Sequence, residues 1–525
     1  MAVNNEYTGL LAFQQTSHNH NMSSSPEDRS GIPALIVGAG NGGRLICEEL
    51  RRNPHWGLVP AGFVDDNPAL IGKNVSHVRV FADTSRIPEM VAAHGIEVVI
   101  LAIPSADRVT HARLGDLARQ TPARVLTMPD LGAILRGENS ATAIHDVRPA
   151  DFLNRASVSA NGPRCRDFIA GRRVLITGAA GSIGSELTRQ VAQLAPSELI
   201  LLDINETGLY DLELDLQFAA SDVPLRLIVG TVTNRTRIDR IVRQTRPDII
   251  FHAAAYKHVP LMEENPDEAV WTNVLGTRSV AEAAARHGVS RFVLVSTDKA
   301  VRPSSVMGAT KRLAELEMAT IAEETGLSAC GVRFGNVLGS RGSVIPTFNQ
   351  QIDVGGPVKV THPEMKRYFM TIPEASSLII EAGALGDKGA IYMLDMGEEV
   401  SILDLAHKMI RARGLRIGKD IEIVFTGMRP GEKLREELNL PSEATNLTAN
   451  QKIRRLTTSR ALAAAYREAR ERIETLLIQT DDMRIRPSLL KIISAVDGMH
   501  NLGPSAQHEL ANFVEPTVSA TRVSA

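Results

Sequence analysis

The strongest constraint on the fold is a glycine-rich segment that separates an apolar run from a helical pattern. Residues 178–184, Gly-Ala-Ala-Gly-Ser-Ile-Gly, come directly after the run Val174–Thr177. Glycines at these places let the chain turn sharply, bring backbone N–H groups up to a pyrophosphate, and allow a helix to pack closely on a sheet. A strand, such a loop and a helix together are typical of a dinucleotide-binding βαβ unit.

The surrounding sequence repeats this alternation. Helical patterns separate most of six apolar runs, which are Val174–Ile176, Leu199–Leu202, Leu225–Val229, Ile249–Phe251, Phe292–Val295 and Gly331–Phe334. This order predicts the α/β class, with a doubly wound parallel sheet of the Rossmann type as the catalytic domain. Beyond residue 340 the alternation gives way to loops and short strands, where we expect a C-terminal substrate-binding subdomain.

A smaller unit of the same kind precedes this domain. Its loop, Gly38-x-Gly40-x-x-Gly43, also follows an apolar run, and Asp65 or Asp66 ends the next run. Because no catalytic set follows the loop, two interpretations stay open, a nucleotide site and a structural or regulatory Rossmann-like module. The expected divisions of the chain are a disordered tail (1–30), a Rossmann-like domain (31–135), a connector (136–170), an NAD-binding catalytic domain with its substrate subdomain (171–440), a C-terminal helical extension (441–500) and a flexible tail (501–525).

Composition excludes several classes of protein. The 58 Lys and Arg residues nearly balance the 60 Asp and Glu residues, so no basic field exists to hold nucleic acid. The three cysteines lack metal-ligand spacing, which predicts no metal site and a reducing compartment. No apolar run reaches the about 18 residues of a membrane helix, and the N-terminus does not resemble a signal peptide. We therefore expect a cytoplasmic protein without membrane insertion, and a homo-oligomer.

The cofactor is predicted from an acidic residue. Asp203 ends the second run of the larger unit, 19 residues after Gly184. A carboxylate there can accept hydrogen bonds from an adenosine ribose and would repel a 2′-phosphate, which favours NAD over NADP. The residues expected to bind the cofactor are Gly178, Gly181, Ser182, Ile183, Gly184, Asp203, Ala253, Ala254 and Lys311.

The chemistry is predicted to lie after the run 292–295. In a doubly wound sheet the carboxyl ends of the strands face the ligand, so Thr297, Asp298 and Lys299 should face the nicotinamide. Met307 and Lys311 have the spacing of the Tyr-x-x-x-Lys pair of short-chain dehydrogenases, but methionine cannot deprotonate an alcohol as tyrosine can. Proton transfer must therefore pass to the other three residues, while Lys311 holds the nicotinamide ribose. An adjacent acid and base such as Asp298 and Lys299 can also be a solvated turn on the surface. Their position between the strand and Lys311 favours a catalytic role instead.

Other segments carry candidates for the substrate. Lys257 and His258 follow the fourth run and can reach an anionic ligand, although His258 could equally be a packed structural histidine. Asn273 could brace the active-site strand rather than contact a ligand. Arg429, beside a Pro-Gly turn and Glu432, is suited to bidentate phosphate contact.

Together these motifs resemble the extended short-chain dehydrogenase/reductase superfamily. More narrowly, they resemble its polysaccharide-biosynthesis branch of UDP-N-acetylglucosamine 4,6-dehydratases, over roughly residues 151–438. The resemblance rests on residues 177–187, Lys-His-Val-Pro at 257–260, Ser-Thr-Asp-Lys-Ala at 296–300, Met-Gly-Ala-Thr-Lys at 307–311, residues 335–346, and Arg-Pro-Gly-Glu-Lys at 429–433. Larger members of that branch also have a preceding Rossmann-like domain, and their membrane helices are not carried over to this sequence.

The resemblance implies a lyase reaction on a UDP-sugar, most specifically UDP-N-acetylglucosamine. NAD takes a hydride from sugar carbon 4 and returns it to carbon 6 after water is lost. Lys299 is then the base at carbon 5 and Asp298 the acid at carbon 6, while Thr297 or Asp298 deprotonates the carbon 4 hydroxyl. The family positions that hold UDP are Asn336, Arg341, Val344, Pro346, Arg429 and Glu432. Two rivals are a 4-epimerase or other nucleotide-sugar oxidoreductase of the same fold, and a non-catalytic NAD-binding sensor.

Overall fold

A computed structural model gives the fold for most of the chain. It describes residues 31–53, 57–103, 106, 108–127, 145–146, 162–219, 222–386, 389–413, 415–440, 443–456, 466–467, 469–471, 473–474, 477 and 482–496. The predicted tails 1–30 and 501–525 lie outside the described residues, as do most of the predicted connector and part of the C-terminal extension. No helix in the described part of the chain is long and apolar enough to cross a membrane.

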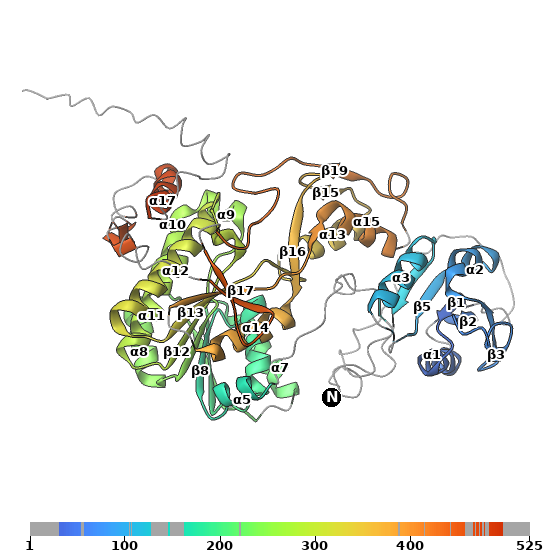
Figure 1. Ribbon diagram of the computed structural model, residues 1–525, viewed down its shortest axis with the longest axis horizontal. Coiled ribbons are helices and arrows are strands. Elements are labelled where there is room, and N and C mark those ends of the chain that lie inside the picture. Colours follow the sequence, from blue (N-terminus) through green and yellow to red (C-terminus); the bar gives the residue numbers. More distant parts are fainter. Residues whose placement is uncertain are drawn as a thin grey trace, which may run out of the picture.

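The first unit is a twisted sheet with helices on both faces (Figure 1). Its strand order is β3-β4-β2-β1-β5-β6-β7. The strands are β1 (Ile32–Val37), β2 (Leu58–Val64), β3 (Asn74–Val75), β4 (Val78–Ala82), β5 (Val98–Leu101), β6 (Arg124–Thr127) and β7 (His145–Asp146), and the helices are α1 (Asn41–Arg52), η2 (Thr84–Arg86), α2 (Ile87–Ala93) and α3 (Arg108–Arg119). Successive residues of β1 enter opposite apolar clusters, Ile36 one and Leu35 and Val37 the other, because side chains alternate along a strand. This confirms the predicted Rossmann-like unit.

The second unit has a larger sheet, in the order β10-β9-β8-β11-β12-β13-β17-β21-β20. Its strands are β8 (Arg173–Thr177), β9 (Glu198–Asp203), β10 (Leu225–Val229), β11 (Ile249–His252), β12 (Arg291–Val295), β13 (Ala329–Arg333), β17 (Ala390–Leu394), β20 (Thr445–Leu447) and β21 (Ile453–Leu456). The six predicted runs are strands β8 to β13, all parallel. A seventh parallel strand, β17, and the antiparallel β21 and β20 extend the sheet beyond the prediction.

Helices cover both faces of this sheet, which confirms the doubly wound class (Figure 1). They are α5 (Pro163–Ile169), α6 (Ser182–Ala192), α7 (Glu206–Phe218), α8 (Arg235–Thr245), α9 (Val259–Glu264), α10 (Pro266–Ala269), the π-helix η4 (Val270–Leu275), α11 (Gly276–Arg286), the 3₁₀ helix η5 (Asp298–Ala300), α12 (Val306–Thr325) and α14 (Ile372–Leu385). Their starts follow ordinary capping rules: Asn205, Asn234 and Ser305 each accept a backbone N–H of the first turn, which satisfies an otherwise orphaned donor.

A smaller subdomain follows the carboxyl end of β13 in the main sheet. It contains β14 (Asn336–Leu338), α13 (Val344–Asp353), β15 (Val358–Val360), β16 (Lys366–Thr371), β18 (Glu399–Ser401), α15 (Ile402–Ala412) and β19 (Ile423–Phe425). Phe348, Phe369 and Leu405 belong to its own apolar core. The chain leaves the subdomain after β16, forms α14 and β17 of the main sheet, and returns to pair β18 with β16.

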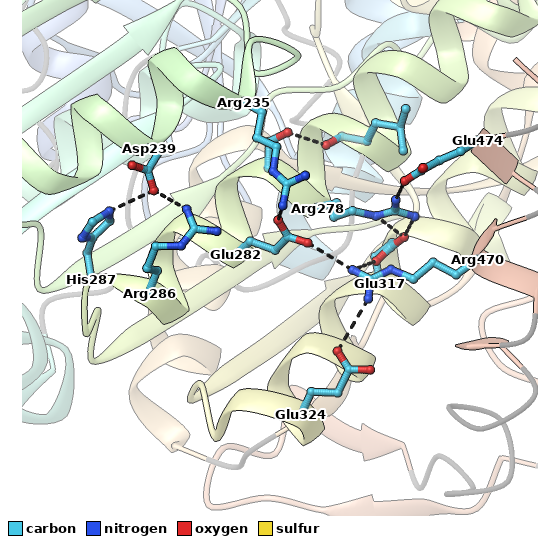
Figure 2. A network of polar contacts seen from close by, with 12 residues as sticks. Arg235, Asp239, Arg278, Glu282, Arg286, His287, Glu317, Glu324, Arg470 and Glu474 are labelled. Atoms are coloured by element: carbon cyan, nitrogen blue, oxygen red, sulfur yellow. Dashed lines mark hydrogen bonds and ion pairs between the residues drawn. The ribbon is translucent and has the colours of Figure 1, made fainter. Parts of the chain in front are cut away.

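The C-terminal residues pack on the outer side of α12. Tyr466, Ile473 and α17 (Asp482–Val496) share one apolar cluster with residues of α12 such as Leu313 and Leu316. An ionic network joins the same elements: Glu317 of α12 contacts Arg278 of α11 and Arg470 of the C-terminal segment (Figure 2). Tyr466, also from the C-terminal segment, donates a hydrogen bond to Glu317. Helix α12 is therefore held on both sides, and Glu317 is fully buried.

Candidate active site

The glycine-rich segment between β8 and α6 has two positions, Gly178 and Gly184, with no room for a Cβ. Gly178 has φ +69°, and a Cβ there would lie 2.6 Å from the backbone nitrogen of Ala254. A Cβ on Gly184 would lie 2.0 Å from the carbonyl oxygen of Gly178. Helix α6 begins after Gly181 without a side-chain cap, so its first N–H groups are open to an anion. This cradle fits the pyrophosphate of a dinucleotide.

Asp203, at the end of β9, fixes this loop to the neighbouring strand. Its Oδ2 accepts the N–H of Ala180 at 2.9 Å, and its Oδ1 accepts the N–H of Asn205 at 2.9 Å. Asp65 in the first unit makes the same pair of bonds, to Ala39 at 2.7 Å and Asn67 at 2.8 Å. The acid at the end of the second strand thus positions the turn in both units.

The Thr297-Asp298-Lys299 segment forms η5 at the carboxyl end of β12. Thr297 caps η5 and also donates from Oγ1 to Asp298 Oδ1 at 2.9 Å. Lys299 Nζ donates to the same Oδ1 at 3.0 Å and to Asn336 Oδ1 at 3.2 Å. Asp298 is fully buried, and its Oδ2 has no hydrogen-bond partner among the described residues. Burial by itself lowers the pKa of Lys299, but the carboxylates of Asp298 and Glu436 raise it above its usual value.

Helix α12 brings two further predicted residues to this edge. Lys311 is buried and donates from Nζ to the carbonyl of Val295 at 2.6 Å. Burial lowers the pKa of Lys311 to about 8. Met307 lies one turn earlier on the same helix and also lines the cavity described below. Asn273 is a brace: its amide bonds both backbone groups of Tyr256, at 2.8 and 3.1 Å, and Thr310 Oγ1 at 3.0 Å.

A buried ionic cluster holds the backbone that leads into the Thr297-Asp298-Lys299 segment. Ser296 donates to Glu315 Oε1 at 2.6 Å, and Arg333 at the end of β13 holds both oxygens of Glu315 at 2.7 and 2.8 Å. Burial raises the pKa of Glu315, but Arg333 outweighs it and brings the pKa down to about 2. Arg333 also contacts Glu443 at 2.8 Å. The ends of β12 and β13 are therefore fixed to α12 by charge as well as by packing.

These segments surround a cavity of about 630 Å³. Sixteen of the predicted residues line it, namely Gly178, Gly181, Ser182, Ile183, Gly184, Ala253, Lys257, His258, Thr297, Lys299, Lys311, Asn336, Arg341, Val344, Arg429 and Glu432. Four lie outside this lining: Asp203, Ala254, Asp298 and Pro346. Asp203 and Ala254 contact the glycine loop, and Asp298 lies behind Thr297 and Lys299.

Cations gather at the subdomain end of the cavity. Partial burial, and then the charge of Arg341, lowers the pKa of Lys257. His258 is exposed on the cavity wall rather than packed in the core, and its ring lies so close to Gly342 that a Cβ there would be 2.5 Å from it. Partial burial and Lys257 lower the pKa of His258. Mutually repelling cations of this kind are suited to a phosphate-bearing ligand. Among the described residues, no group of three or more acidic, His or Cys side chains is placed to hold a metal ion.

Two residues of the site were missed from the sequence. Arg367 of β16 lines the cavity. Glu436 follows the Arg-Pro-Gly-Glu-Lys segment; its Oε1 is 3.7 Å from Lys299 Nζ and 3.9 Å from Arg367 Nε. The acidic pair Glu436-Glu437, three residues after Lys433, was the available signal. No periodicity in this irregular segment indicated which of the two carboxylates faces inward.

Both units are similar to known proteins. Residues 174–458 match the profile of the polysaccharide biosynthesis protein family, and residues 11–129 match that of a CoA-binding domain. The chain is 43% identical over 407 residues to the capsular polysaccharide biosynthesis protein CapD of Staphylococcus aureus, covering 77% of this chain and 68% of that protein. It is 34% identical over 274 residues to a UDP-glucose 4-epimerase of Rickettsia akari, covering 51% of this chain and 77% of that protein.

Solved structures are also similar to this chain, and that of Pen is one example. The X-ray structure of Pen from Bacillus thuringiensis matches with a TM-score of 0.52 and 32% sequence identity, covering 55% of this chain and 89% of that chain.

Proposed function

Since the chain belongs to the polysaccharide biosynthesis protein family, we propose that it is an NAD-dependent nucleotide-sugar 4,6-dehydratase. Its substrate in this proposal is a UDP-hexose, and UDP-N-acetylglucosamine is the first candidate. The observation that carries the proposal is the contact between Asp298 and Lys299 at the carboxyl end of β12, beside a methionine where an alcohol dehydrogenase would need an ionisable hydroxyl. That arrangement supplies an acid and a base to neighbouring sugar carbons.

The glycine cradle and Lys311 are the residues that would hold NAD. Gly178, Gly181 and Gly184 leave the backbone open for the pyrophosphate, and Asp203 lies where an adenosine ribose would be bound. Lys311 lines the cavity beneath the site and would contact the nicotinamide ribose. When bound, NAD supplies a temporary acceptor for one hydride of the sugar, which is returned within the same turnover.

The cationic end of the cavity would bind the diphosphate. Arg341 and Arg429 offer planar guanidinium groups, and Lys257 and His258, close to residues 341–342, add further donors. Asn336, Val344 and Glu432 also line this end. Binding UDP there directs the sugar toward Thr297 and Lys299.

The proton transfers fall to three adjacent side chains. Asp298 would take the proton of the carbon 4 hydroxyl through Thr297, whose Oγ1 lies 2.9 Å from Asp298 Oδ1. The same proton would then pass from Asp298 to the carbon 6 hydroxyl as water leaves. Lys299 would remove the carbon 5 proton and return it to that carbon, so the residues end each turnover as they began.

A 4-epimerase is the second candidate, supported by the 34% identical UDP-glucose 4-epimerase of Rickettsia akari. Epimerisation needs one group that takes the proton of the carbon 4 hydroxyl and returns it directly to that oxygen. Met307 occupies the place from which a tyrosine would do so. This difference favours dehydration.

Mass spectrometry of a single incubation tests the proposal. The purified protein is mixed with UDP-N-acetylglucosamine, and the expected product is a 4-keto-6-deoxy sugar nucleotide lighter than the substrate by one water. A product of unchanged mass that co-elutes with UDP-N-acetylgalactosamine would replace the dehydratase with an epimerase. Bound NAD without turnover of any UDP- or dTDP-hexose would support a non-catalytic sensor instead.

A further inference from the structure

Glu436 is a buried carboxylate directly behind Lys299. Its side chain is only 4% exposed, and it does not belong to the cavity lining formed by the described residues. Its Oε1 lies 3.7 Å from Lys299 Nζ, while its Oε2 has no hydrogen-bond partner in the described part of the chain. A buried carboxylate with an unused oxygen is costly, so its position calls for a compensating role.

The segment that carries Glu436 is held in place by the subdomain. Arg367 donates to the carbonyls of Lys433 and Leu434 at 2.7 and 3.0 Å, and Lys433 Nζ donates to the carbonyl of Val301 at 2.9 Å. These bonds tie residues 433–434 both to β16 and to the turn that follows η5. The carboxylate of Glu436 is therefore fixed behind Lys299 by backbone contacts.

The surroundings of Lys299 match an ammonium group. Nζ donates to Asp298 Oδ1 at 3.0 Å and to Asn336 Oδ1 at 3.2 Å, and it forms an ion pair with Glu436 Oε1 at 3.7 Å. Arg367 and Lys433 are cations that oppose this ammonium. Lys299 can accept a proton from carbon 5 only as a neutral amine. The neighbouring carboxylates stabilise its ammonium form, so they determine how readily the neutral amine is formed.

We propose that Glu436 is a positioning residue that holds the amine of Lys299 between two carboxylates and sets the pH at which Lys299 becomes a base. Asp298, on the same turn, bonds both Thr297 and Lys299 of the cavity lining, whereas in the proposed mechanism Glu436 acts only through Lys299. The direction follows from charge: the carboxylates of Asp298 and Glu436 favour the ammonium form, and Arg367 opposes them. The catalytic part of this inference rests on the proposed dehydratase function.

Removing the charge of Glu436 tests the proposal without changing its shape. In E436Q the pKa of Lys299 should fall by about 1 to 3 pH units, the range produced by one opposite charge at this distance. The pH profile of kcat should then move to lower pH by the same amount, with little change in KM because Glu436 does not line the cavity. E436D keeps the charge and should keep most of the wild-type profile.

Glu437 provides the matched control. It neighbours Glu436 in sequence but is 40% exposed and pairs with Arg302 at 3.1 Å. E437Q should leave the pH profile where it is in the wild type. An equal shift in E437Q and E436Q would overturn the proposal, because a general change of charge in the segment would then explain both.

A second measurement needs no substrate. Competitive acetylation of the full-length protein across a pH series, with the peptide containing Lys299 quantified by mass spectrometry, gives the pKa of that amine directly. A lower pKa in E436Q but not in E436D supports the role of Glu436 even if no sugar nucleotide is dehydrated, in which case the proposed function alone fails. An unchanged pKa in E436Q overturns the inference whatever the activity.

Discussion

The hydroxyl of Tyr466 is predicted to anchor the C-terminal segment to helix α12. Tyr466 is fully buried and donates to Glu317 Oε1 at 2.9 Å (Figure 2 shows the surrounding network). Burial, and then the Glu317 carboxylate, raises the pKa of Tyr466 well above its usual value, so the hydroxyl remains a donor. Tyr466→Phe keeps the ring and creates no cavity. It removes one hydrogen bond to a charged group, which is worth about 1.5–3 kcal/mol.

The loss should not be larger, because Glu317 stays paired in the variant. Arg278 and Arg470 still contact its carboxylate, so the variant avoids the about 3–5 kcal/mol that an uncompensated buried charge costs. Amide hydrogen exchange of peptides containing residue 466 should therefore accelerate about 10- to 150-fold, since each 1.4 kcal/mol is tenfold.

Two comparisons make the assay decisive. Arg467 pairs with Glu323 at 2.7 Å, and both side chains are more than 40% exposed, so Arg467→Gln should change exchange by less than about fivefold. In a Glu317→Gln background the Tyr466→Phe effect should shrink to that of a neutral hydrogen bond, about 0.5–1.5 kcal/mol. Exchange in Tyr466→Phe no faster than in Arg467→Gln would refute the reasoning.

Three further predictions concern the site. Lys299→Met should reduce dehydration about 10²- to 10⁴-fold, as loss of a general base does, with NAD still bound; retained turnover would exclude Lys299 as the base. Gly184→Ala places a Cβ 2.0 Å from the Gly178 carbonyl oxygen and should strip the purified protein of NAD, measured by nucleotide released on denaturation. Gly162→Ala, where a Cβ meets no atom within 4 Å, should leave the cofactor content unchanged. Because burial lowers the pKa of Lys311 from 10.5 to about 8, the unfolded chain binds more protons between these values, and the free energy of unfolding should rise with pH across them. Lys311→Met should abolish that rise in denaturant titrations at pH 8 and pH 10; an identical rise in the variant would assign it to another group.

The predictable parts of the fold are those determined by local sequence patterns. Strands β8, β9 and β11 to β13 are short apolar runs because both faces of the sheet are covered there, whereas the edge strand β10 is only partly buried. Strand β17 is an equally buried run of five residues, but it follows the subdomain segments, so its place beside β13 depends on packing that no local pattern records.

The same distinction applies to the site. Asp298 and Lys299 are neighbours in sequence at the end of a strand, and their contact was therefore predictable. Glu436 reaches Lys299 from a segment without regular structure, and its direction is fixed by hydrogen bonds of that segment to Arg367. Asp203 was predicted from its spacing, but its bonds to Ala180 and Asn205 required coordinates.

The path of the chain between the main sheet and the subdomain limits how such a protein can diversify. Strand β17 and helix α14 are threaded between β16 and β18, so no single cut separates the subdomain from the sheet. The subdomain consists of two separate segments, each flanked by elements of the main sheet, so its exchange between relatives would need four crossovers, and the pairing of β18 with β16 would have to be preserved. New sugar preferences should therefore arise by stepwise substitution along α13, β16 and residues 429–436, and engineering of this scaffold is better directed at those positions than at recombination.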